Sequence, residues 1–137
     1  MHLAYHIRVP TRVTLPRKTK SDKKVTLSVS TYRNMHYMVE TKCKHIFADI
    51  LNPQLKATGL SNQQFDKIAV VINYEPYDKR TRDLDNQCSI LMKYLGDCLS
   101  EMGIIPDDNL NHVSTIIEYS SCTVRKEDWA DVWIIED

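Results

Sequence analysis

The chain has 137 residues, no net formal charge, 42% hydrophobic residues and 26% charged residues, with a mean hydropathy of −0.40. These values are typical of one soluble globular domain. They exclude collagen-like, disordered and membrane-spanning chains, since no apolar run approaches the ~20 residues that span a bilayer. The first residues lack the basic and then apolar pattern of a secretory signal, and the four cysteines form no CxxC pair. We therefore expect a cytoplasmic protein with reduced thiols.

Charge is distributed unevenly along the chain. Residues 1–24 carry seven basic groups and one acid, a net charge of +6, whereas residues 101–137 carry nine acids and two basic groups, a net charge of −7. A basic segment favours phosphates and an acidic region can hold cations, but solvated charge runs are also common without either ligand. The charge pattern is compatible with nucleic-acid binding and does not establish it.

The first half of the chain predicts a strand, a basic arm and a helix. Apolar residues alternate with polar ones over 3–9, which is typical of a strand with one buried face. Shorter alternating runs on either side of a basic stretch predict a hairpin or extended arm at about 10–30. Apolar residues at helical spacing predict a helix over 31–51, with Pro53 just beyond its end.

The second half predicts a central strand, a long helix and two further strands. Residues 67–74 form an apolar run, and from Leu84 to Met102 apolar residues recur at steps of three and four, which predicts a helix over 84–102 ended by Gly103. Strands are expected at 113–119 and 131–136. The predicted fold is a single α+β domain of β-α-β-α-β-β order, with a mixed sheet packed on two helices.

A basic loop meets two carboxylates where the second helix is expected to begin. Asp83 and Asp85 flank Leu84, the first residue of the apolar stripe, so both acids are expected near the helix start. Asp is also favoured there for structural reasons, because it accepts hydrogen bonds from free backbone N–H groups and suits the helix dipole. Both a functional and a structural interpretation of this pair stay open.

A second acidic pair, Asp107 and Asp108, follows the far end of the same helix. From Asp85 to Gly103 a straight helix rises roughly 27 Å. The two clusters therefore meet only if the chain folds back after Gly103, or if an antiparallel second subunit supplies one cluster to the other. An ordinary turn or helix cap also explains this pair.

Carboxylate oxygens suit Mg²⁺, which proteins usually hold with one or two carboxylates together with water and substrate phosphates. A metal held in this way supports phosphoryl transfer, with neighbouring Lys or Arg side chains holding the phosphates.

The run Arg82–Asn86, the helix behind it and the run Gly103–Asp108 resemble the RusA-type Holliday junction resolvases, small endodeoxyribonucleases of bacteria and phages. The resemblance covers most of residues 68–119. It implies a homodimer that depends on Mg²⁺, with Mn²⁺ as the alternative metal, and that has no organic cofactor or membrane partner. Such an enzyme introduces paired nicks in four-way and other branched DNA during recombination and repair.

The resemblance also implies the site residues. The family's catalytic acids and metal ligands correspond to Asp83, Asp85 and Asp108, with Asp107 as an additional ligand. The residues expected to bind DNA are one amide and the basic side chains of the loop and arm: Lys79, Arg80, Arg82, Asn86, Arg17, Lys18, Lys20, Lys23 and Lys24.

One position departs from the family pattern. The family tends to carry a lysine one turn after the second aspartate, where this chain has Ser89. Lys79, Arg80 and Arg82 are the expected substitutes, because Lys93 lies ~12 Å along the helix from Asp85. The alternative function is a non-catalytic dimeric DNA-binding or regulatory protein that retains the fold. A metal–nucleotide site of a transferase or phosphatase is disfavoured, since the chain has three scattered glycines and no Gly-rich phosphate loop.

Overall fold

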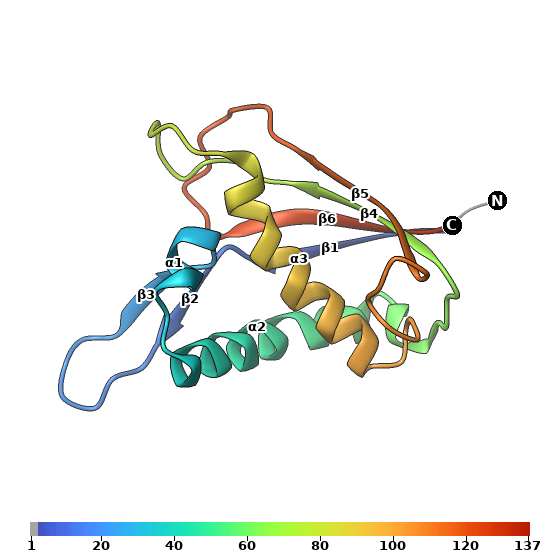
Figure 1. Ribbon diagram of the computed structural model, residues 1–137, viewed down its shortest axis with the longest axis horizontal. Helices are drawn as coiled ribbons and strands as arrows, with labels where there is room; N and C mark the ends of the chain where they lie inside the picture. Colours follow the sequence, from blue (N-terminus) through green and yellow to red (C-terminus); the bar gives the residue numbers. More distant parts are fainter. Residues whose placement is uncertain (1–2) are drawn as a thin grey trace.

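Two long helices cover one face of a mixed four-stranded sheet in the computed structural model, which describes residues 3–137 (Figure 1). The strands are β1 (Ala4–Pro10), β2 (Arg12–Leu15), β3 (Lys23–Thr26), β4 (Ile68–Asn73), β5 (Val113–Tyr119) and β6 (Trp129–Glu136). The helices are α1 (Val29–Arg33), α2 (Tyr37–Ala57), the short 3₁₀ turn η1 (Leu60–Asn62) and α3 (Leu84–Glu101). The protein is therefore an α+β domain, as predicted. None of the helices in residues 3–137 is long and apolar enough to cross a membrane.

The sheet has the strand order β1-β6-β4-β5. Strand β6 pairs antiparallel with β1 and β4, whereas β4 and β5 are parallel. Parallel neighbours need a crossover connection, which α3 supplies between β4 and β5. This β4-α3-β5 unit carries both predicted acidic clusters.

One face of the sheet is buried and the other is partly open. Along β4, Ile68, Val70 and Ile72 are fully buried against the helices, while Ala69 and Val71 on the opposite face are only half-buried. A continuous apolar run such as that of β4 is typical of a strand covered on both faces, but here the described residues cover only one. The central position of β4 is nevertheless confirmed.

The predicted strands and long helix match the structure closely, and the basic arm is a hairpin. Strands β2 and β3 pair antiparallel from Arg12 opposite Thr26 to Leu15 opposite Lys23. The hairpin extends away from the four-stranded sheet (Figure 1). Strand β6 begins at Trp129, two residues before its predicted start. The predicted element order omitted the two hairpin strands.

The prediction of one helix over 31–51 is wrong: the chain forms two helices there, and their outer ends differ from the predicted ones. The chain forms the short α1, breaks at Asn34, and starts α2 at Tyr37, where the His36 side chain accepts a hydrogen bond from the Met38 N–H as a cap. Helix α2 also continues through Pro53 to Ala57. Pro53 is exposed, while the fully buried Leu55 extends the apolar stripe. The packing of that side chain outweighs the loss of one backbone hydrogen bond.

The turn after α3 follows the prediction. Gly103 has φ of +73°, a left-handed conformation that glycine adopts without steric cost, and the Ile104 N–H returns to the Leu99 carbonyl at 3.0 Å. Ile104 and Ile105 are buried. Their burial directs the following chain back along α3.

Candidate functional site

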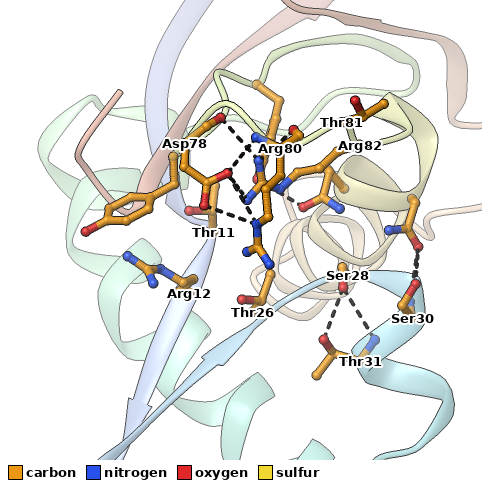
Figure 2. A pocket seen from close by; sticks show the side chains of 14 residues that line it. Thr11, Arg12, Thr26, Ser28, Ser30, Thr31, Asp78, Arg80, Thr81 and Arg82 are labelled. Atoms are coloured by element: carbon orange, nitrogen blue, oxygen red, sulfur yellow. Dashed lines mark hydrogen bonds and ion pairs between the residues drawn. The ribbon is translucent and has the colours of Figure 1, made fainter. Parts of the chain in front are cut away.

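The basic loop between β4 and α3 is folded around Asp78. The Asp78 carboxylate accepts hydrogen bonds from the Arg80 backbone N–H at 3.0 Å and pairs with the Arg82 guanidinium at 2.8 Å. The Arg80 backbone bond, followed by the two guanidinium groups, lowers the pKa of Asp78. The Arg82 side chain is only 18% exposed, whereas that of Arg80 is 80% exposed. Figure 2 shows the three side chains together. Arg82 therefore holds the loop. Arg80 also approaches Asp78, with its Nε 3.3 Å from the carboxylate, and its two terminal nitrogens keep free donors.

Two exposed carboxylates stand at the start of α3. Asp83 occupies the N-cap position, but its side chain makes no capping hydrogen bond. Asp85 lies in the first turn and accepts a hydrogen bond from the Ser89 hydroxyl at 3.0 Å. Asp83 thus does not cap the helix with its side chain, and its carboxylate is available to a ligand.

Glu118 is a further acid at this site, and the sequence analysis missed it. It is half-buried on β5, and burial, followed by the nearby Asp85 carboxylate, raises the pKa of Glu118. The sequence did contain a signal for Glu118. When a helix connects two neighbouring parallel strands, as α3 connects β4 and β5, an acid on the second strand can lie next to that helix.

Asp108 does not lie at the start of α3. It approaches the helix at Gly96, about three turns after Asp85. A Cβ atom added to Gly96 would lie 3.0 Å from both Cβ and Oδ2 of Asp108. Gly96 is ~16 Å along the helix axis from Asp85. The fold-back after Gly103 therefore shortens the separation that a straight path predicts, without bringing Asp108 beside Asp85.

Asp107 is engaged in its own turn. One carboxylate oxygen accepts the Asp108 N–H at 2.8 Å, and the other accepts the Asn109 amide at 3.2 Å. The backbone hydrogen bond lowers the pKa of Asp107, whereas burial and then the hydrogen bond with Asp107 raise the pKa of Asp108. Asp108 thus takes up a proton first as the pH falls, while Asp107 remains the anion that shapes the turn.

A groove of about 440 Å³ runs between α3 and the chain that carries Asp108. It is lined by Ser89, Met92, Lys93, Asp108, Asn109, Leu110, Val113 and Ile116. Ser89, which bonds Asp85, and Asp108 both line this groove. Lys93 is the cation within it, so Lys93 is better placed in this groove than the loop residues expected to replace the family lysine.

A metal site made by all three predicted acids is not assembled in the described chain. No three His, Cys, Asp or Glu side chains within residues 3–137 converge on a point where they could hold one ion. Asp83 and Asp85 lie together because they are two residues apart, and Asp108 lies away from them. Of the three predicted acids, one chain therefore brings together only Asp83 and Asp85, with Glu118 nearby on β5.

The remaining predicted DNA contacts divide into engaged and free side chains. The Asn86 carbonyl oxygen accepts hydrogen bonds from the Ser30 N–H and hydroxyl at 3.1 Å each, which ties α3 to α1. In the hairpin, Arg17 donates to the Ser21 carbonyl and Lys24 pairs with Asp128 at 2.8 Å. Among the predicted DNA contacts, the exposed side chains with neither an ion pair nor a hydrogen bond in the described chain are Lys18, Lys20, Lys23 and Lys79. These lysines are the ones free to meet phosphates.

Comparison with known proteins adds no relative. No protein-family model matches the sequence, and no curated protein matches it. The resemblance to RusA-type resolvases therefore depends on the two acidic runs and the helix between them.

Proposed function

We propose that this protein is a Mg²⁺-dependent, structure-selective endodeoxyribonuclease that resolves four-way and other branched DNA by paired phosphodiester hydrolysis, with Mn²⁺ as a possible replacement. The observation that carries the proposal is the pair Asp83 and Asp85. Both carboxylates are exposed at the start of α3, neither has a capping bond, and the basic loop adjoins them.

The metal's protein ligands in this proposal are Asp83 and Asp85. Two carboxylates fit Mg²⁺, which takes its other ligands from water and substrate phosphates. Once bound, the ion supplies charge stabilisation at the phosphate and a more acidic water. Ser89 orients Asp85 through its hydroxyl, and Arg80 offers free guanidinium donors to the DNA backbone.

The proposed homodimer uses the outer edge of β5, which has no strand partner among residues 3–137. Ile116, Ile117 and Tyr119 on this strand are 47%, 49% and 43% exposed. An unpaired edge with exposed apolar side chains favours pairing with another strand. A two-fold dimer matches the symmetry of a four-way junction, and it offers a route for Asp108 of one subunit to reach the acids of the other.

The test is incubation of the purified protein with labelled four-way junction or linear duplex, each with Mg²⁺ or EDTA. Paired nicks on the junction alone, abolished by EDTA, support the proposal. Intact junction in every lane contradicts it.

A non-catalytic dimeric DNA-binding protein is the second candidate. Two observations favour it: the family lysine is replaced by Ser89, and Asp108 packs against Gly96, which lies ~16 Å along α3 from Asp85. Tight junction binding that is equal in Mg²⁺ and EDTA, without nicks, identifies this function.

A further inference from the structure

A second groove lies between the basic loop, the β2–β3 hairpin and α1 (Figure 2). Its volume is about 530 Å³, and its walls carry three guanidinium groups, from Arg12, Arg80 and Arg82, together with Ser and Thr hydroxyls. Asp78 is the one acid among its described lining residues. The groove therefore has a net positive lining that suits a phosphate.

Two of the three guanidinium groups are fixed in place. Arg12 pairs with Asp128 at 2.6 Å and lies 4.1 Å from the centre of the Tyr77 ring. Arg82 is held by Asp78. Side chains that are already ordered lose little conformational entropy when a ligand binds, so these cations are prepared for an anion. Arg80 also pairs with Asp78, through Nε at 3.3 Å, but its side chain is mostly exposed, so its two terminal nitrogens are free to close on the anion.

The groove is also lined by polar side chains whose hydrogen-bonding atoms are free to meet a ligand. Gln87 is 6% exposed, and its carbonyl oxygen accepts the Tyr74 hydroxyl at 3.0 Å. The Gln87 amide nitrogen and the hydroxyl of Thr11, which is 8% exposed, make no hydrogen bond within residues 3–137, and neither is a fully buried atom. Both residues line the groove, so both groups can bond a molecule held there. A ligand with polar atoms near its phosphate would supply the bonding partners.

The size of the groove limits the ligand. A volume of about 530 Å³ falls within the ~300–1,000 Å³ of small-molecule pockets. Such a space admits a nucleotide-size unit and not a DNA duplex. Asn86 also lines the groove and directly follows Asp85. A strand held in the groove thus passes close to the start of α3.

We propose that this groove binds one unpaired nucleotide of a DNA strand, with its phosphate on Arg80 and Arg82 and its sugar or base against Gln87 and Thr11. The inference rests on the proposed function, because flaps of branched DNA present unpaired nucleotides and base pairs at a strand-exchange point can open to release one. It adds that the enzyme selects branched DNA by capturing such a nucleotide beside the cutting site.

The experiment measures the binding of a fluorescein-labelled 12-nucleotide single strand and a duplex of the same length by anisotropy, in EDTA and over a range of KCl. Arg80→Gln removes the exposed cation. Gln87→Glu keeps an acceptor for Tyr74 and replaces the amide donor by a carboxylate oxygen. Lys56→Gln, which removes an exposed cation on α2, is the matched control. Thymidine monophosphate serves as competitor.

We expect Arg80→Gln and Gln87→Glu each to weaken single-strand binding about five- to tenfold. Arg80→Gln should also reduce the slope of log K against log[salt] by about 0.7, whereas Lys56→Gln should change neither quantity. Wild-type binding by both groove variants would overturn the proposal. Thymidine monophosphate that binds as tightly as the oligonucleotide would also overturn it, since the ligand would then be a free nucleotide.

Binding in EDTA does not depend on cutting, so the two proposals fail separately. Loss of single-strand binding in the groove variants, with no junction cutting by wild type, refutes only the nuclease proposal. Metal-dependent cutting with normal binding by both groove variants refutes only the groove assignment.

Discussion

Asp108 lies directly against the backbone of Gly96 in the middle of α3, so close that a Cβ at residue 96 would lie 3.0 Å from the Asp108 carboxylate. This contact sets where the second acidic run meets the helix. It also defines a groove that both Ser89 and Asp108 line.

Gly96→Ala should separate helix stability from activity. Alanine favours a helix interior by roughly 0.5–1 kcal/mol over glycine, but here its Cβ must displace Asp108. We expect an unfolding free energy within about 0.5 kcal/mol of wild type, as the two effects offset each other, together with slower junction cutting. Urea denaturation and a cleavage time course measure both. Ser100→Ala on the same helix is the control. Full helix stabilisation with unchanged cutting by Gly96→Ala would show that the contact has no role.

Ser89 gives a prediction in two directions. Ser89→Ala removes the hydrogen bond to Asp85 and should slow cutting. Ser89→Lys places a cation one turn from Asp85, as in the family pattern, and should speed cutting about three- to tenfold, the effect of roughly 1 kcal/mol on the barrier. Thr41→Lys adds the same charge to α2 as a control. Equal initial rates for all four proteins would exclude a role for this position.

Asp128 gives a pH-dependent stability prediction. Burial opposes ionisation, but hydrogen bonds from Lys24 and Arg12 hold the pKa of Asp128 below its ordinary value. The carboxylate therefore stabilises the fold above the unfolded pKa of about 3.9, and this contribution is lost as the pH falls through the lower folded pKa. Asp128→Asn should cost about 1–2 kcal/mol at pH 7, between the values for surface and buried pairs.

The check is urea denaturation of wild type and Asp128→Asn at pH 7 and near pH 3. The difference between the two proteins should shrink at the lower pH. Glu127→Gln, which changes an exposed neighbour, should show no such trend. A difference that stays constant with pH would mean that the ion pairs do not stabilise the hairpin.

The hairpin tip should contribute to DNA affinity through charge alone. Replacement of Lys18, Lys20 and Lys23 by Gln should lower the slope of log K against log[salt] for junction binding by up to about 2.7, since each phosphate contact contributes about 0.9. The matched control replaces three exposed lysines elsewhere: Lys42, Lys56 and Lys67. Equal slopes for the two triple variants would remove the hairpin from the DNA-binding surface.

Local patterns predicted most of the fold. Alternation of apolar and polar residues predicted the strands, and the apolar stripe from Leu84 to Met102 predicted α3. Each element buries one face, and this alone gives a strand its two-residue repeat and a helix its repeat of three to four residues. The break before α2 was missed because His36 caps that helix through its ring nitrogen, a role usually taken by Ser, Thr, Asp or Asn. The end of the helix was predicted too early because proline usually ends a helix. Here α2 continues beyond Pro53, since the buried Leu55 stabilises its last turn.

The candidate site was only partly predictable. Asp83 and Asp85 follow from their place at the start of α3. The position of Asp108 depends on the burial of Ile104 and Ile105, which turns the chain back, and a sequence pattern does not give the resulting distance. Glu118 comes near Asp85 only through the parallel pairing of β4 and β5.

The most direct test of the nuclease proposal compares Asp85→Asn with Asp49→Asn, an exposed acid on α2, on a labelled four-way junction with Mg²⁺. Circular dichroism confirms that both variants fold, and anisotropy in EDTA confirms that both bind the junction. We predict that Asp85→Asn lowers the rate of paired nicking at least about 100-fold, while Asp49→Asn cuts like wild type. Wild-type cutting by Asp85→Asn would contradict the assignment of the catalytic site.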